Sequence, residues 1–235
     1  MVDKICPDIR AAVAVVTDGA TVMIGGFGGA GQPGELIDAL IEHGARELVI
    51  VNNNAGNGET GLAALLKAGR VRKIICSFPR QVDSHVFDNL YRAGKIELEL
   101  VPQGTLAERI RAAGAGIGGF FTPTGYGTIV AEGKETREID GRHFVLERPI
   151  KGDLAIVKAW RGDRQGNLVY RMSARNFNPM MATAAAFTIA EVDELVDVGA
   201  LDPDHVHTPG VFVDAIFQGI GEEKRIEQRT VRKRA

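Results

Sequence analysis

Aliphatic and β-branched runs alternate with segments of helical periodicity along the first half of the chain. Four such runs predict buried strands, at residues 20–24, 48–51, 73–76 and 96–101. Apolar positions recur at helical spacing in the intervening and following segments, at residues 33–42, 62–68, 86–93 and 105–113. This alternation predicts an α/β fold, an open and mostly parallel sheet with helices on both faces.

The second half of the chain has a different pattern. Residues 136–146 alternate charged and apolar side chains around Asp140-Gly141, which predicts a small β-hairpin insertion set on the main sheet. The later segments are expected to be a strand at 153–159, a turn at 162–167, a helix at 180–190, and closing segments at 192–198 and 210–217.

The end of the chain differs again in composition. Residues 221–235 hold six basic and three acidic side chains with few apolar ones. We therefore expect one domain over residues 1–220, followed by a charged tail that is solvated or becomes ordered on a partner.

Composition narrows the class of protein. Of 235 residues, 45% are hydrophobic, 29 are glycine and 9 are proline, and the net charge is −2, so a disordered or collagen-like chain is excluded. The balance of 30 acidic against 28 basic residues argues against nucleic acid as the partner. No apolar run approaches the roughly 18 residues of a membrane span, and no signal-peptide pattern is present. We expect a cytoplasmic protein with no membrane partner.

The glycine excess is concentrated in loops. Six glycines lie within residues 25–34, between a predicted strand and a predicted helix, where backbone N–H groups and the helix dipole favour an anion. The pattern G-x-G-x-x-G occurs there, but the acid that a dinucleotide site needs about 20 residues later is replaced by Asn52-Asn53-Asn54. Six more glycines lie within residues 114–127. Two such clusters favour a ligand site over simple tight turns.

Several ordered motifs resemble the A subunit of class I 3-oxoacid CoA-transferases. They are residues 18–33 (DGATVMIGGFGGAGQP), 53–56 (NNAG), 102–109 (PQGTLAER), 122–128 (TPTGYGT), 158–160 (KAW) and 174–178 (ARNFN). The resemblance runs from about residue 18 to residue 220 and implies the CoA-transferase/NagB-like fold. Within the family, residues 56–62 (GNGETGL) and 76–81 (CSFPRQ) look like enzymes that act on 3-oxoadipate. Enzymes for acetoacetate typically carry a Gly-Glu-Asn-containing stretch where this chain has residues 78–84 (FPRQVDS).

The resemblance also implies a mechanism and a partner. Family members exchange CoA between carboxylates by a ping-pong route through a glutamyl-CoA thioester, a form of covalent catalysis. Their glutamate lies in a Ser-Glu-Asn-Gly motif on the B subunit, and that motif is absent from this chain. The chain is therefore expected to be inactive alone and to form a heterodimer or heterotetramer with the B subunit. Coenzyme A thioesters are the expected substrates, with no permanently bound cofactor and no metal.

The resemblance places a CoA-binding loop in the first glycine cluster. That loop comprises Gly25, Gly26, Phe27, Gly28, Gly29, Ala30 and Gly31. The implied function is transfer of CoA from succinyl-CoA to 3-oxoadipate in aromatic-compound breakdown. One alternative is the corresponding subunit of an acetoacetate or acetate-type transferase. Another, from a different class, is a ligand-sensing subunit on the same scaffold, because fold does not fix function.

Three amide side chains are candidates for positioning the reacting groups. Asn53, Asn54 and Gln103 lie at predicted strand ends, where neutral donors can hold a developing oxyanion; capping of the loop is an equally good interpretation of Asn54. Arg80 falls where the chain departs from the acetoacetate pattern, and we hypothesise that it binds the distal carboxylate of 3-oxoadipate. The alternative for Arg80 is an ordinary surface arginine.

Other reactive side chains lack the neighbours that their chemistry requires. Cys76 is expected to be a small buried residue, not a nucleophile. His205 and His207 have strand spacing, but no further ligand pattern completes a metal site. Glu59 is interpreted as a charge at a helix N-terminus.

Overall fold

A parallel sheet forms the centre of the computed structural model, which describes residues 3–221. Its parallel strands are β1 (Thr21–Ile24), β2 (Leu48–Val51), β3 (Val71–Cys76), β4 (Glu97–Leu100), β8 (Gly152–Asp163), β10 (Ala185–Val196) and β11 (Ala215–Gln218). The strand order is β4-β3-β2-β1-β8-β10-β11, and the short β9 (Leu168–Val169) pairs antiparallel with β8. The chain winds outward from β1 to β4 and then returns to the other side of β1. A topological switch point therefore lies between β1 and β8, where open α/β sheets bind ligands.

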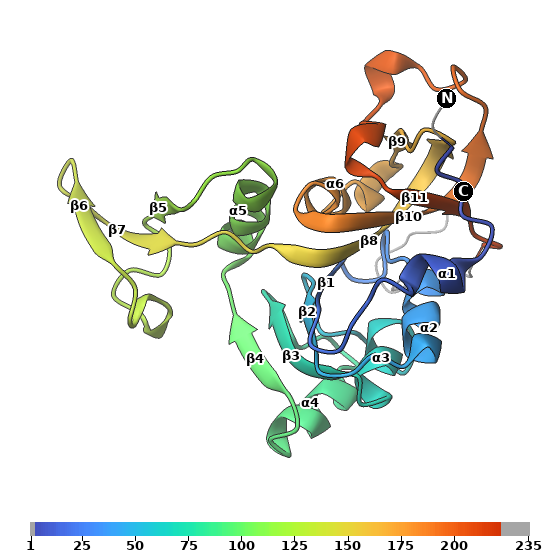
Figure 1. Ribbon diagram of the computed structural model, residues 1–235. Coiled ribbons are helices and arrows are strands. Elements are labelled where there is room, and N and C mark those ends of the chain that lie inside the picture. Colours follow the sequence, from blue (N-terminus) through green and yellow to red (C-terminus); the bar gives the residue numbers. More distant parts are fainter. Residues whose placement is uncertain (1–2, 222–235) are drawn as a thin grey trace, which may run out of the picture.

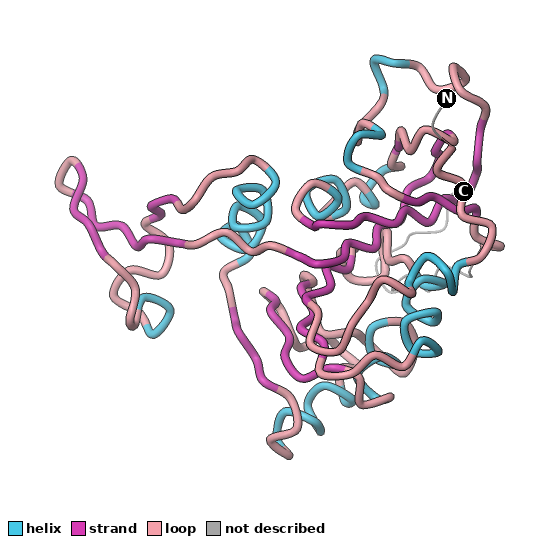
Figure 2. Tube along the Cα trace, in the orientation of Figure 1, coloured by secondary structure: helices cyan, strands magenta, loops and turns pink. Residues whose placement is uncertain are grey.

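Helices cover both faces of this sheet, as the alternation of elements predicted (Figures 1 and 2). On one face lie α1 (Ile9–Val13), α2 (Gly34–His43), α3 (Leu62–Lys67) and α4 (His85–Arg92), and on the other α5 (Gln103–Gly114) and α6 (Asn178–Ala182). Successive residues of one strand enter opposite cores: Ile24 packs with the first group of helices and Met23 with the second. Short 3₁₀ turns occur at η1 (Ile129–Ala131), η2 (Met172–Ala174), η3 (Pro203–His205) and η4 (Gly210–Phe212).

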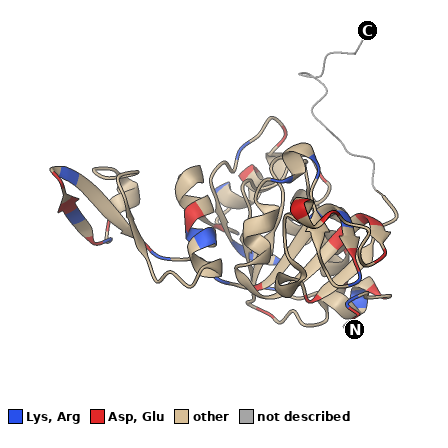
Figure 3. Cartoon of the chain, turned by 90° about the horizontal axis from the view of Figure 1, so that it is seen from above, with Lys and Arg blue, Asp and Glu red and all other residues tan. Residues whose placement is uncertain are grey.

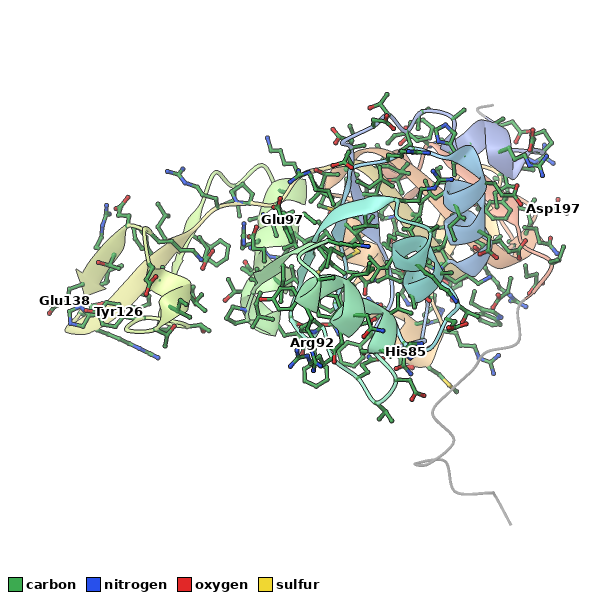
Figure 4. The ribbon with its side chains drawn as sticks, turned by 90° about the horizontal axis from the view of Figure 1, so that it is seen from below. His85, Arg92, Glu97, Tyr126, Glu138 and Asp197 are labelled. Atoms are coloured by element: carbon green, nitrogen blue, oxygen red, sulfur yellow. The ribbon has the colours of Figure 1, made fainter. Side chains whose placement is uncertain are left out.

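The predicted hairpin forms, but it is not set on the main sheet. Strands β6 (Thr136–Ile139) and β7 (Arg142–Glu147) pair antiparallel around Asp140 and Gly141, whose φ angles of 50° and 72° suit a tight hairpin turn. Strand β5 (Phe120–Thr122), from the second glycine cluster, pairs with the other edge of β7. These strands form an arm that projects from the body (Figure 1), and Figure 4 shows Tyr126 and Glu138 near its end.

The helix predicted at residues 180–190 is wrong. The helix α6 ends at Ala182, and β10 begins at Ala185 and pairs with β8 from Ala185 opposite Gly152 to Val196 opposite Asp163. A run of alanines has high helix propensity, but ten paired positions along a long neighbouring strand outweigh that local preference. The turn predicted at residues 162–167 is shorter, because β8 continues to Asp163.

Two further expectations concern the charged tail and membrane-spanning segments. Except for Gly221, the predicted tail lies outside the described residues. Within residues 3–221, none of the helices has the length and apolar character that crossing a bilayer demands.

Candidate functional site

The candidate site lies where the carboxyl ends of β1, β2 and β3 meet the start of α5. The glycine loop follows β1, Asn53 follows β2, Ser77 follows β3, and Gln103 is the first residue of α5. Residues far apart in the sequence meet here because parallel strands all end at the same edge of the sheet.

The glycine loop is a tight reversal whose tip reaches solvent. Phe27 and Ala30 exchange backbone hydrogen bonds, with N···O distances of 3.0 and 3.1 Å, so Gly28 and Gly29 form the tip. Gly26, Gly28 and Gly31 have φ angles of 122°, 58° and 71°, which glycine adopts without strain. Within residues 3–221, the N–H groups of Gly28 and Gly29 have no hydrogen-bond acceptor. Free N–H groups at such a tip can receive an anionic ligand.

Asn53 is oriented by two donors. Its Oδ1 accepts from Ser77 Oγ at 2.7 Å and from Gln103 Nε2 at 2.8 Å, so the carbonyl end of the amide is fully occupied. The Nδ2 group donates to no atom in the described part of the chain. The structure thus brings the predicted Asn53 and Gln103 together and leaves one amide donor free. Ser77 was missed as a site residue, although it lies in the motif at residues 76–81.

The neighbouring asparagines have more structural contacts. Asn52 is buried and donates from Nδ2 to Ile24 O at 2.6 Å, while its Oδ1 accepts from Asn54 N at 2.9 Å. Asn54 Oδ1 accepts from Gly56 N at 2.9 Å, which is the capping contact expected of a loop asparagine. Asn54 Nδ2 is buried and has no partner among the described residues. A buried donor of this kind is costly unless a ligand or water satisfies it.

Arg80 lies in the loop between β3 and α4. Its Nε donates to Asp88 Oδ1 at 2.7 Å, and 57% of its side chain is exposed. No hydrogen bond joins it to Asn53 or Gln103 in the described chain. A contact with a substrate carboxylate would require exchange of the Asp88 partner.

A cavity of about 530 Å³ opens beside Gln103, between α5 and β5. Its lining is Gly104, Thr105, Glu108, Phe120, Phe121, Thr122, Pro123 and Thr124. Gly104 lies in the first turn of α5, and a Cβ atom added there would meet nothing within 4 Å. Neither packing nor backbone conformation requires glycine at this position, so a side chain at residue 104 would extend into the cavity.

A buried ion pair joins β8 and β10 to the start of α2, the helix that follows the glycine loop. Lys158 Nζ contacts Glu191 Oε1 and Asp193 Oδ1, both at 2.8 Å, and Glu191 Oε2 accepts from Leu36 N at the start of α2. Burial acts most strongly on Lys158 and opposes its charge, but the two carboxylates outweigh burial and raise the pKa of Lys158. Lys158 therefore stays protonated and links its own strand, β8, to β10, which carries both carboxylates. Sequence reasoning assigned it no role beyond membership of the motif at residues 158–160.

The remaining reactive candidates show no sign of catalysis. Burial raises the pKa of the Cys76 thiol to about 12, so this thiol is not a nucleophile at neutral pH. Glu59 is exposed and pairs with Lys67 at 3.1 Å. Over residues 3–221, no three His, Cys, Asp or Glu side chains are grouped to hold a metal ion. Basic and acidic segments are interspersed along the described chain (Figure 3).

Comparison with known proteins agrees with this architecture. The sequence matches the Coenzyme A transferase family over residues 7–219. It is 66% identical to the A subunit of 3-oxoadipate CoA-transferase from Pseudomonas putida, over 92% of this chain and 94% of that protein. It is 54% identical to the A subunit of succinyl-CoA:3-ketoacid coenzyme A transferase from Xanthomonas campestris pv. campestris (strain B100), over 96% of this chain and 93% of that protein.

A solved structure shows the same fold. An acyl-CoA transferase from Escherichia coli O157:H7, in a thioester complex with CoA, superposes with a TM-score of 0.84 at 23% identity. The match covers 94% of this chain and 48% of that protein, so the chain spans about half of its length. From the match over residues 7–219 and the identity to the A subunits of such enzymes, the chain belongs to the Coenzyme A transferase family.

Proposed function

We propose that this chain is the A subunit of a cytoplasmic, heteromeric CoA-transferase that moves CoA from succinyl-CoA to 3-oxoadipate during aromatic-compound breakdown. The observation that carries the proposal is the Asn53 amide, whose Oδ1 is held by Ser77 and Gln103 while its Nδ2 stays free. Such a fixed donor suits a reaction in which negative charge develops on a carbonyl oxygen. The 66% identity to a chain of 3-oxoadipate CoA-transferase supports the choice of acid.

The nucleophile comes from the partner. In the first half of the ping-pong reaction, the carboxylate of a glutamate of the B subunit attacks succinyl-CoA and displaces the CoA thiolate, which gives an acyl anhydride; the thiolate then attacks the glutamyl carbonyl, which forms glutamyl-CoA and releases succinate. In the second half, 3-oxoadipate takes CoA from glutamyl-CoA by the same two steps in reverse, and each attack on a carbonyl passes through an oxyanion. Asn53 Nδ2 donates to that oxyanion, and Gln103 positions Asn53. Asn54 Nδ2, buried and unpaired among the described residues, is a second donor close to the same strand end.

The substrates lie along the carboxyl edge of the sheet. The glycine loop after β1 receives the phosphate-bearing end of CoA through the amides of Gly28 and Gly29. The thioester reaches Asn53, and the acyl group enters the cavity beside Gln103, which is lined partly by threonine hydroxyls. Arg80 does not line this cavity, so it pairs with the distal carboxylate of 3-oxoadipate only after release from Asp88 and movement toward the acyl group.

The A subunit of an acetoacetate-type transferase is the second candidate. The 54% identity to a chain of succinyl-CoA:3-ketoacid coenzyme A transferase favours it. The two candidates differ in the acid that accepts CoA, so they are distinguished by specificity and not by mechanism.

Co-expression with a B subunit carrying Ser-Glu-Asn-Gly tests both candidates. The complex is expected to exchange CoA between succinyl-CoA and a panel of 3-oxo acids, with the highest kcat/KM for 3-oxoadipate, while the chain alone shows no exchange. A preference for acetoacetate selects the second candidate. Absence of exchange with every carboxylate contradicts both and favours a ligand-sensing role.

A further inference from the structure

Two asparagines of the segment at residues 174–178 hold consecutive carbonyl groups of the glycine loop. Asn176 Nδ2 donates to Ala30 O at 3.0 Å, and Asn178 Nδ2 donates to Gly31 O at 2.9 Å. We call Asn176 and Asn178 the asparagine clamp. The two contacts span 146 and 147 residues of sequence, so they are tertiary anchors and not local turns.

The clamp explains why two positions of the loop are glycine. A Cβ atom at Gly25 would lie 1.7 Å from Asn178 Oδ1, and one at Gly31 would lie 2.7 Å from Asn178 Nδ2. The backbone of Gly25 is not in the left-handed region, so close approach of Asn178 is the reason for glycine there.

The orientation of Asn178 is fixed from its other side. Asn178 is fully buried, and its Oδ1 accepts from Lys158 N at 3.0 Å, which turns Nδ2 toward the loop. Its second N–H donates to Ala174 O at 3.0 Å, just as the second N–H of Asn176 donates to Ser173 O at 2.7 Å. Both amide groups therefore use their full donor capacity.

These contacts change what the loop offers to a ligand. Backbone carbonyl oxygens repel anions, and the clamp holds those of Ala30 and Gly31 against side-chain donors. The amides of Gly28 and Gly29 have no acceptor in the described chain. The loop is thereby left with N–H groups, which attract negative charge, at its exposed tip.

We propose that Asn176 and Asn178 are positioning residues that prepare the glycine loop to bind the diphosphate of a CoA thioester. The proposal rests on the proposed function, because it requires CoA to be the ligand of this loop. It goes further by assigning the phosphate affinity of the loop to two side chains that do not themselves touch the reacting atoms.

The test compares a complete thioester with one that lacks the nucleotide end. In the assembled enzyme, Asn176→Asp and Asn178→Asp keep the side-chain shape but replace each donor with an acceptor facing a carbonyl oxygen. We expect KM for succinyl-CoA to rise about 10- to 100-fold, the usual effect of leaving a buried polar group unpaired. With succinyl-pantetheine, which has no diphosphate, kcat/KM is expected to stay within about twofold of wild type, because these side chains act only through the loop.

Controls separate positioning from folding and from the proposed function. Asn89→Asp places the same charge on the exposed face of α4 and is expected to leave both substrates unaffected. If Asn178→Asp does not fold, the half-buried Asn176→Ala carries the test. The proposal is overturned if kcat/KM falls equally with succinyl-CoA and succinyl-pantetheine. It is also overturned if an active variant keeps the wild-type KM for succinyl-CoA. A wild-type complex that does not exchange CoA contradicts the proposed function instead.

Discussion

At the scale of single residues, Asn53 offers the most direct test of chemistry. Its free Nδ2 is the donor assigned to the oxyanion, and removal of one such donor typically lowers kcat by about 100- to 1,000-fold. We therefore expect Asn53→Ala to lower kcat by this factor in the assembled enzyme, with little change in KM for succinyl-CoA. Steady-state kinetics beside Asn89→Ala, on exposed helix surface, provide the comparison. A kcat within about threefold of wild type excludes Asn53 as the donor.

Gly104 gives a test in which stability and activity move in opposite directions. Glycine in a helix interior costs about 0.5–1 kcal/mol relative to alanine, which is an upper bound for Gly104 in the first turn, and a methyl group there meets no atom of another segment within 4 Å. Gly104→Ala is expected to raise the free energy of unfolding by at most that amount and to lower kcat/KM, because the methyl group enters the cavity assigned to the acyl group. Urea unfolding and kinetics check the two effects.

The matched control is Gly118→Ala, in a loop outside the cavity lining, where an added Cβ atom also meets nothing within 4 Å. That variant is expected to keep wild-type kcat/KM. If Gly104→Ala is stabilised and equally active, the acyl group does not occupy this cavity.

The sequence suggested some of the candidate site residues but not the side chains that hold them. Asn53 and Gln103 could be placed at strand ends, and the structure joins them by a hydrogen bond of 2.8 Å. Ser77 and Asn178 lie in the motifs at residues 76–81 and 174–178, but no local pattern marks them as partners of Asn53 or of the glycine loop. Their contacts depend on which strand ends and loops meet in space, and only the topology supplies that information. The role of Arg80 stays a prediction.

At the scale of elements, prediction was accurate where local signals agreed. The glycine loop, the proline at its end and the apolar spacing together placed α2 within a residue or two of its observed bounds, Gly34–His43. At residues 180–190 the helix propensity of the alanines opposed the pairing with β8. The prediction followed the propensity, but the pairing determines the structure. The hairpin could be predicted from its turn at Asp140-Gly141. Its place in a separate three-stranded arm could not, because β5 and β7 are far apart in the sequence.

The segment after β9 gives an element-scale prediction about pH. Tyr170 N donates to His207 Nδ1 at 2.9 Å, a contact that requires neutral His207. Burial, followed by the charges of Arg175 and His205, lowers the pKa of His207 below its ordinary value. The unfolded chain thus binds a proton more readily than the folded one. Neutral His207 therefore makes its full contribution to the free energy of unfolding above a pH of about 6.5. That contribution decreases as the pH drops below this value, toward the lower pKa of the folded state.

Replacement of His207 by asparagine tests whether this contribution to stability decreases as the pH is lowered. Asparagine offers a neutral oxygen near the place of Nδ1 and does not titrate. We expect the difference in unfolding free energy between His207→Asn and wild type to shift in favour of the variant as the pH is lowered from about 7.5 to about 5. Urea unfolding across that range measures the difference. A difference that is independent of pH contradicts the assignment.

At the scale of the whole molecule, the buried Lys158–Glu191 pair joins β8 and β10, on one side of the switch point, to α2, which follows β1 on the other side. Lys158 lies on β8 and Glu191 on β10, while Glu191 also accepts from Leu36 N on α2, which follows the glycine loop. The strand β8 thus connects through this pair to the helix that covers the other half of the fold. Side-chain exposures of 10% and 1% place the pair in a medium where an unpartnered charge is costly.

Replacing Lys158 alone should therefore lower the free energy of unfolding more than replacing Lys158 and Glu191 together. Lys158→Met leaves the Glu191 carboxylate buried without its cation, and we expect a loss of about 3–5 kcal/mol in the free energy of unfolding. The double variant Lys158→Met, Glu191→Leu removes both buried charges and leaves only the partly exposed Asp193 carboxylate without the Lys158 cation. It is therefore expected to recover a large part of that loss, although it carries two substitutions. Fluorescence of Trp160, the one tryptophan in the sequence and two residues beyond Lys158 on β8, reports the unfolding directly. If the double variant is as unstable as the sum of the two single variants, the charges act independently, and the pair does not couple β8 to β10.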